Sequence, residues 1–210
     1  MAGKAEKSGS AAEGRRERIA TVTRKTQETD ISLSLKLDGT GSAEISTGVG
    51  FLDHMLTLLA RHSLTDLSVR AAGDLHVDQH HLTENVGICF GEALRAALAD
   101  KSGIRRYGWA LMPMEESLVS VALDLGGRPF FVWHVPMPTE KVGQFDTQLI
   151  EEFWRAVSNH GLLNLHVRLE YGTNSHHVAE AVFKGVARAL AQAVERDPRV
   201  QGVPSTKGAL

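Results

Sequence analysis

Two copies of the pattern HHxxE are the residues best suited to chemistry, because histidine and glutamate bind divalent metals and move protons. Each copy has two adjacent histidines followed by a glutamate: His80, His81 and Glu84 in the first, and His176, His177 and Glu180 in the second. On a helix, neighbouring side chains point about 100° apart, so the two histidines of one copy diverge. The glutamate lies at i+3 and i+4 and can share a face with either histidine. Each copy therefore predicts ligands for two different metal ions.

Two further residues are candidate ligands, because His54 and Glu152 occupy matching places in the two halves of the chain. Imidazole nitrogen and carboxylate oxygen suit a first-row divalent metal such as Zn, Fe, Ni or Mn. Cys89 is the only cysteine, so a thiolate zinc site of the finger type is disfavoured. Neither copy is HExxH or HxxEH, the zinc-protease arrangements. One isolated HH pair is usually a solvated helix start, and the repetition favours the metal interpretation.

The elements that must carry these residues also repeat. Alternation of apolar and polar residues predicts a strand at 31–37, and helical spacing predicts helices at 51–62 and 81–103, the second ending at Gly103. The second half repeats this order, with three chemically notable pairs at matching positions: Glu28 with Glu116, His54 with Glu152, and His62 with His160. A repeat of roughly half the chain implies two copies of one unit.

The repeat predicts an α+β fold of two-layer sheet-and-helix units, with an internal duplication of two similar halves. Residues 1–14 lack apolar periodicity and are expected to be a disordered tail. The other expected boundaries are 15–102 for the first half, 103–200 for the second half, and 201–210 for a C-terminal tail.

Composition disfavours several classes of protein. The chain has 210 residues, of which 42% are hydrophobic, and a formal net charge of −2. We expect no nucleic-acid partner, because there is no basic excess or Lys/Arg run. We expect neither membrane insertion nor secretion, because no apolar run of about 18 residues and no leader pattern occurs. A single cysteine excludes an internal disulfide and fits a reducing compartment, so a cytoplasmic location is expected.

From about Arg18 to Leu210 the sequence resembles the imidazoleglycerol-phosphate dehydratases of histidine biosynthesis. The stretches that carry the resemblance are RKTQETDI, GVGFLDHML, GDLHVDQHHLTENVGI, GIRRYG, DLGGRPFF, FDTQLIEEF, NLHV, NSHHVAEAVFKGVARAL and GVPSTKG. It implies a ribosomal-protein-S5-domain-2-like fold and a hydro-lyase that converts D-erythro-imidazole glycerol phosphate to imidazole acetol phosphate. It also implies two Mn(II) ions per active site and a homo-oligomer, a 24-mer with sites between subunits.

The resemblance implies a set of metal ligands: His54, His80, His81, Glu84, His176, His177 and Glu180, with a further ligand at Glu152. Many relatives carry a histidine at position 152. A carboxylate can still ligate Mn(II), and the alternative is that Glu152 only contacts a ligand. Asn85 replaces a usual acid just after the first motif, and we expect at most an indirect effect on the metal.

The reaction must remove a carbon-bound proton that is barely acidic, because no carbonyl group lies next to it. A metal on a ring nitrogen would stabilise an imidazolate-like intermediate. The resemblance makes Glu180 the candidate base and Glu28 the candidate for holding or protonating the substrate's hydroxyl groups. Glu116 has no assigned role. The alternative for Glu28 is a solvated acid at a strand end.

The phosphate of the substrate needs cationic or N–H donors. The resemblance supplies the candidates Arg106, Arg128, Lys184, Ser205 and Lys207, the last two in the C-terminal tail. That tail is not a P-loop, because its lysine precedes the second glycine. Five histidines have no assigned role: His62, His76, His134, His160 and His166.

Two other classes of function remain open alternatives. A metal-assembled shell without catalysis would keep the HHxxE ligands but would need neither Glu28 nor the phosphate-binding tail. An RNA-binding module is disfavoured, because a basic face and an aromatic platform are missing. Some relatives are fused to a histidinol-phosphate phosphatase. Here the stretch KLDGT lacks the first aspartate of a DxDGT motif, so a monofunctional chain is expected.

Overall fold

In the central strand of each half, buried residues alternate with more exposed ones. The structure is a computed structural model that describes residues 17–208, and the expected tail at 1–14 lies outside these residues. In the first half Ile31 and Leu33 point into the core, and in the second half Val119 and Val121 do so at matching positions. Apolar residues at every second position place one face of each sheet against the helices. One continuous core includes residues of both halves.

The two halves have the same order of elements. The first consists of β1 (Ile19–Lys25), β2 (Thr29–Lys36), β3 (Ala43–Ser46), α1 (Gly50–Ser63), β4 (Asp66–Gly73) and α2 (His80–Leu98). The second consists of β5 (Tyr107–Met114), β6 (Ser117–Asp124), β7 (Phe130–His134), the hairpin β8 (Lys141–Val142) and β9 (Phe145–Asp146), α3 (Gln148–Gly161), β10 (Asn164–Tyr171) and α4 (Ser175–Val194). The hairpin is an addition without a counterpart in the first half.

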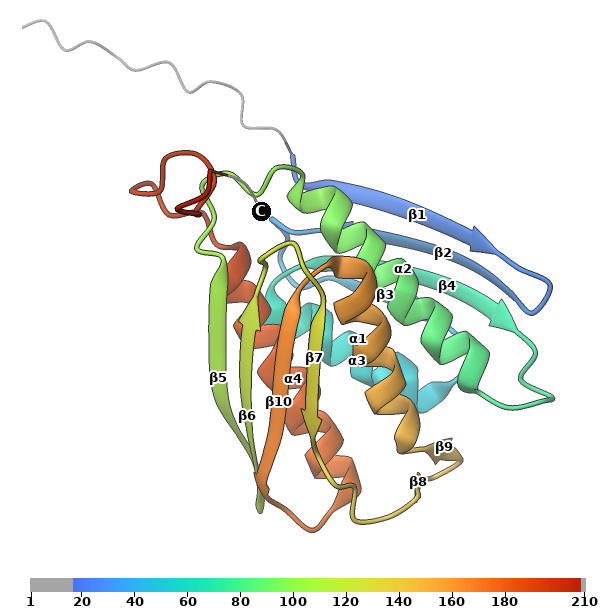
Figure 1. The fold of residues 1–210 in the computed structure, drawn as a ribbon. Helices are drawn as coiled ribbons and strands as arrows, with labels where there is room; N and C mark the ends of the chain where they lie inside the picture. The colour runs from blue at the N-terminus through green and yellow to red at the C-terminus, as the bar shows by residue number, and fades with distance from the viewer. Residues whose placement is uncertain (1–16, 209–210) are drawn as a thin grey trace, which may run out of the picture.

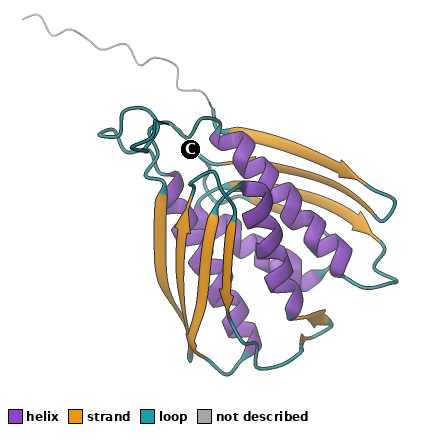
Figure 2. Cartoon of the chain, in the orientation of Figure 1, coloured by secondary structure: helices purple, strands orange, loops and turns teal. Residues whose placement is uncertain are grey.

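The sheets have equivalent topologies. Their strand orders are β1-β2-β4-β3 and β5-β6-β10-β7. In each sheet the first three strands are antiparallel neighbours and the last pair is parallel. The helices lie between the two sheets (Figures 1 and 2). Two helix pairs cross from one half to the other, since α1 packs against α4 and α2 packs against α3. The predicted α+β fold with two similar halves is confirmed.

Close packing of α2 and α3 depends on glycine. A Cβ atom at Gly87 would lie 2.7 Å from the carbonyl oxygen of Phe153, and one at Gly91 would lie 2.7 Å from the backbone nitrogen of Gly161. Real Cβ atoms do not approach other atoms so closely, so only glycine allows this helix separation. The α2–α3 pair is therefore held at a distance set by these two residues.

The helix expected at 81–103 is shorter at its C-terminus. It ends at Leu98, and the next residues turn, with positive φ at Ala99 (51°) and Lys101 (61°). The buried Lys101 ammonium donates to the carbonyl of Leu125 at 3.0 Å. This contact with the second half replaces a further helical turn, so the prediction that the helix ends at Gly103 was wrong. The helix expected at 51–62 is confirmed by α1.

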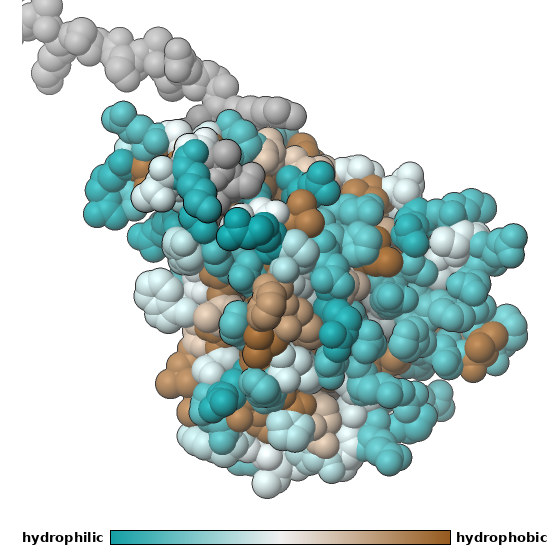
Figure 3. Space-filling model, in the orientation of Figure 1, coloured by the Kyte–Doolittle hydropathy of each residue, from teal (hydrophilic) through white to brown (hydrophobic). Residues whose placement is uncertain are grey.

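The outer faces of the two sheets differ in character. On the second sheet Trp109, Leu111 and Phe130 are 68%, 62% and 60% exposed, and apolar side chains gather over this sheet in the space-filling view (Figure 3). On the first sheet a shallow depression is lined mainly by polar and charged residues, including Asp30, Ser32 and Arg70. Within residues 17–208, no helix combines the length and apolar character required to cross a bilayer.

Candidate active site

Packing of α1 against α4 brings together ligands from both halves. The Oε1 atom of Glu180 lies 2.9 Å from Nε2 of His54 and 3.2 Å from Nε2 of His176. One ligand atom from each of the three residues lies within 4.8 Å of the others. Glu180 is buried, whereas both imidazoles are partly exposed. Two imidazole nitrogens and one carboxylate oxygen therefore converge on a point that is open on one side.

Glu180 also accepts a hydrogen bond from a lysine. The Lys184 ammonium lies 2.5 Å from Oε2 of Glu180, one helical turn away on α4. Burial by itself would raise the pKa of Glu180, but hydrogen bonds from Lys184, His54 and His176 outweigh it and lower the pKa to about 2. The carboxylate is therefore ionised at neutral pH, as a metal ligand must be.

A second cluster surrounds the start of α2. Nδ1 of His81 lies 2.9 Å from Oδ2 of Asp74, and 3.7 Å from Oε2 of Glu28. The hydrogen bond with Asp74 raises the pKa of His81. Sequence reasoning missed this contact of Asp74 with His81. These three residues form the other group that could hold a cation among the described residues.

The corresponding histidine of the second half also has an acidic partner. Nδ1 of His177 lies 2.6 Å from Oε2 of Glu116, in the turn between β5 and β6. The hydrogen bond with His177 is the main reason that the pKa of Glu116 falls to about 2. Glu116 had no predicted role, although its position matching Glu28 was a signal in the sequence.

Adjacent histidines diverge in both motifs. The ring planes of His80 and His81 are 80° apart with centroids separated by 6.2 Å, and those of His176 and His177 are 84° apart at the same separation. The two imidazoles of one motif therefore do not face a common ion.

Four predicted ligands join neither group in the part of the chain described: His177, whose partner is Glu116, and His80, Glu84 and Glu152. The last three lie on α2 and α3 at the repeat positions of His176, Glu180 and His54. Oε2 of Glu152 lies instead 3.5 Å from Nε of Arg155.

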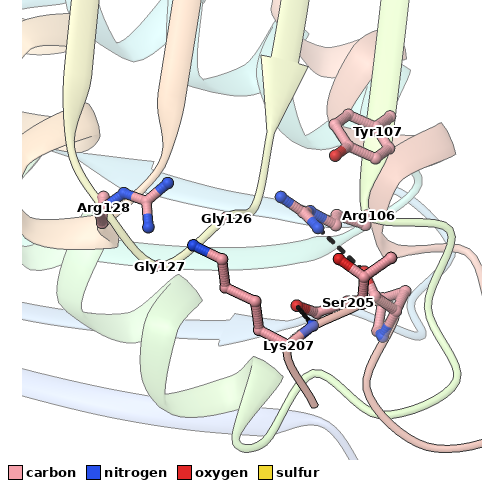
Figure 4. A pocket seen from close by; sticks show the side chains of 9 residues that line it. Arg106, Tyr107, Gly126, Gly127, Arg128, Ser205 and Lys207 are labelled. Carbon is pink, nitrogen blue, oxygen red and sulfur yellow. Dashed lines mark hydrogen bonds between the residues drawn. The ribbon is translucent and has the colours of Figure 1, made fainter. Parts of the chain in front are cut away.

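Most of the predicted phosphate ligands line one cavity of 760 Å³. Its lining includes Arg106, Arg128, Ser205 and Lys207, together with the Gly126-Gly127 turn. The cationic ends of the two arginines and the lysine point toward a common space (Figure 4). Lys184 does not line this cavity, because it contacts Glu180.

Arg106 organises the cavity. Its guanidinium donates to Oδ1 and Oδ2 of Asp124 at 2.7 and 3.0 Å, and to the carbonyl of Pro204 at 2.9 Å. It thereby ties the C-terminal tail to the end of β6. Asp124 neutralises Arg106, so Arg128 and Lys207 supply the remaining positive charge. Such a group of cations suits an anion.

The cavity and the histidine clusters lie at opposite ends of the helices. His176 is in the first turn of α4, whereas the backbone nitrogen of Arg106 donates to the carbonyl of Ala193 in its last turn. A helix of 20 residues is about 30 Å long. The cationic pocket and the histidine–carboxylate clusters of one chain are therefore far apart.

Fold and site together define a class of protein: a duplicated α+β protein with histidine–carboxylate clusters at the starts of two helices and a separate cationic pocket. A sequence model of the imidazoleglycerol-phosphate dehydratase family matches residues 47–190. The chain is 61% identical over 194 residues to the imidazoleglycerol-phosphate dehydratase of Granulibacter bethesdensis, covering 92% of this chain and 99% of that protein. It is 60% identical to that of Roseobacter denitrificans, covering 92% and 100%.

Solved structures agree with these sequence matches. The crystal structure of imidazoleglycerol-phosphate dehydratase from Staphylococcus aureus superimposes with a TM-score of 0.78 at 41% identity, covering 85% of this chain and 99% of that one. The enzyme from Pyrococcus furiosus gives 0.77 at 36% identity, covering 90% and 100%. The chain belongs to the imidazoleglycerol-phosphate dehydratase family. The prediction of a hydro-lyase of this family is confirmed.

Proposed function

We propose that this protein dehydrates D-erythro-imidazole glycerol phosphate to imidazole acetol phosphate in histidine biosynthesis, using two Mn(II) ions per active site. Membership of the family supports the reaction. The observation that carries the proposal is the convergence of His54, His176 and Glu180 from two halves of the chain onto one point. No noncatalytic role explains why a cationic pocket for phosphate accompanies these ligands.

The donor set fits the metal. Imidazole nitrogen and ionised carboxylate oxygen are ligands that Mn(II) accepts, and the two Nε2 atoms already point at one carboxylate oxygen. His54, His176 and Glu180 would hold one ion, and His81 and His177 would contribute Nε2 atoms to ions in other directions. When bound, the ions supply Lewis-acid stabilisation of the negative charge that the imidazole ring carries after proton loss.

The carboxylates of Glu180 and Glu28 have different proposed roles. Glu180 lies among the ligand atoms of the α1–α4 cluster, and we assign it both the ligand role and the role of the base that removes the carbon-bound proton. Glu28 is half exposed, and its carboxylate is beyond hydrogen-bond distance of His81. It is therefore free to hold a substrate hydroxyl group and to protonate it as it leaves.

Separation of the pocket from the clusters supports an active site shared between subunits. The substrate has a three-carbon chain between ring and phosphate, far shorter than the roughly 30 Å length of α4. One copy would therefore bind the phosphate while another supplies metal ligands, in a homo-oligomer such as the 24-mer that the resemblance implies. The apolar outer face of the second sheet supports assembly, since soluble proteins bury such surfaces against a partner.

Turnover of imidazole glycerol phosphate by metal-stripped protein tests the function, before and after addition of Mn(II), with bound metal counted on the same sample. We expect product only after metal is added, at close to two ions per chain. Bound metal without product would favour the noncatalytic shell. A protein that binds no metal and forms no product would refute the proposal.

A further inference from the structure

The second histidine of each HHxxE motif has a carboxylate at Nδ1, but the two carboxylates occupy different places in the repeat. His81 contacts Asp74, just before α2, at 2.9 Å. His177 contacts Glu116, in the β5–β6 turn, at 2.6 Å. Glu28 is the counterpart of Glu116 in the β1–β2 turn, and its nearest oxygen is 3.7 Å from the His81 ring. The two repeat-related acids therefore make different contacts.

Glu116 is firmly held where it meets the helix. Its Oε1 atom accepts hydrogen bonds from the backbone nitrogen of Asn174 at 2.9 Å and from the hydroxyl of Ser117 at 3.0 Å. Asn174 in turn caps α4, since its side chain accepts from the backbone nitrogens of His176 and His177. The same carboxylate thus contacts the cap of α4 with one oxygen and the His177 ring with the other.

We infer that Glu116 is a positioning residue that holds His177 in the tautomer and orientation needed for metal binding through Nε2. An acceptor at Nδ1 places the ring proton there and leaves the lone pair on Nε2. Asp74 does this for His81 in the first half. Glu28 is therefore released for contact with the substrate, so the duplicated acid has acquired two roles. The inference rests on the proposed metal-dependent function for its meaning, but the tautomer can be measured without metal.

The test compares E116A, E116Q and the neighbouring E115Q with the unmodified protein. Glu115 is exposed and serves as the matched control. Nitrogen chemical shifts of histidine-labelled, metal-free protein report the tautomer of His177, assigned by the signal missing in H177Q. Mn(II) titration reports the number of sites and their affinities, and the melting temperature of the metal-free protein reports folding.

We expect E116A to convert His177 from one tautomer to a mixture and to weaken one class of Mn(II) site by about 10- to 100-fold. The affinity of the other class of Mn(II) site and the melting temperature of the metal-free protein should stay unchanged. E116Q retains a carbonyl oxygen that can accept a hydrogen bond from Nδ1–H, so it should lose less Mn(II) affinity than E116A. E115Q matches the unmodified protein. An unchanged tautomer and unchanged affinities in E116A would overturn the inference, as would equal loss of all sites with a lower melting temperature. A fixed tautomer in a protein that binds no Mn(II) would instead refute the proposed function.

Discussion

The two helix pairs that cross between the halves have equivalent backbones but different ligands. In the α1–α4 pair, His54, His176 and Glu180 converge on one point. In the α2–α3 pair the equivalent places hold Glu152, His80 and Glu84, and Glu152 contacts Arg155. One imidazole has been replaced by a second carboxylate, and two carboxylates repel each other unless a cation lies between them. The duplicated backbone sets the positions, and the side chains decide whether the ligands meet without a metal.

The opposite ends of the same halves differ as well. Arg18 contacts Asp38 and the carbonyl of Val194, much as Arg106 contacts Asp124 and the carbonyl of Pro204. Thr40, however, stands at the repeat position of Arg128, and the PSTKG segment contributes only to the second site. A cationic pocket is therefore found at one of the two ends, although an arginine–aspartate contact is present at both and the aspartate of the first half lies two residues further along the repeat.

The largest effect is expected from removing the carboxylate at the centre of the α1–α4 cluster. E180Q removes the negative charge that His54 and His176 share, and leaves the mostly buried Lys184 without its charged partner. We expect kcat to fall on the order of 10³-fold or more, with the loss of one bound Mn(II) per chain by metal analysis. Retention of both ions would show that the α1–α4 cluster is not a metal site.

Replacing the exposed arginine of the pocket tests the second comparison. R128A removes a charged donor to phosphate, and we expect KM to rise about 10- to 100-fold with a smaller change in kcat. T40A, at the equivalent place of the first half, should leave steady-state kinetics unchanged. Equal effects of the two substitutions would mean that both ends bind the substrate.

Helix separation provides a stability test of the α2–α3 pair. In G87A the new Cβ atom would lie 2.7 Å from the Phe153 carbonyl oxygen, so α3 must shift. We expect a loss of about 1–3 kcal/mol in the free energy of unfolding, seen as a lower melting temperature. G50A is the control, since no atom lies within 4 Å of its Cβ position. A melting temperature equal to that of G50A would contradict the close packing.

The smallest effect concerns the ligand at position 152. E152H restores the imidazole found at His54, and softer nitrogen favours Zn(II) over Mn(II) relative to carboxylate oxygen. We therefore expect the ratio of Zn(II) to Mn(II) affinity to rise severalfold, up to about tenfold, as measured by competition titration. E151Q, at the neighbouring residue, should leave the ratio unchanged. An unchanged ratio in E152H would exclude Glu152 as a ligand.

Local pattern predicted much of this arrangement. Apolar spacing located α1 within a residue at each end, and helical geometry predicted that the adjacent histidines diverge, as their ring planes show. The pairing of His54 with Glu180 could not be derived from local spacing, because it depends on packing between α1 and α4. The contact of His81 with Asp74 likewise depends on the path of the loop before α2.

The ion pair of Lys184 was visible in the sequence. Lys184 lies at i+4 from Glu180 and pairs with it on α4, while its predicted contact with phosphate stays a prediction. A glutamate followed by lysine at this spacing is a common helical ion pair. The end of α2 was not visible in this way, because the contact of Lys101 with Leu125 belongs to the other half.

The most direct test of the account is complementation between two variants impaired in different parts, E180Q with an intact cationic pocket and R128A with intact metal ligands, at a substrate concentration well below the KM of R128A. The two proteins are dissociated, mixed in equal amounts and reassembled with Mn(II), and turnover is compared with that of each variant treated alone. If a site takes its pocket from one copy and its metal ligands from another, about a quarter of the sites in a random homo-oligomer regain both parts. Activity near a quarter of that of the unmodified protein is the predicted result. Activity no higher than the average of the two variants, in oligomers shown to contain both, would contradict the shared site.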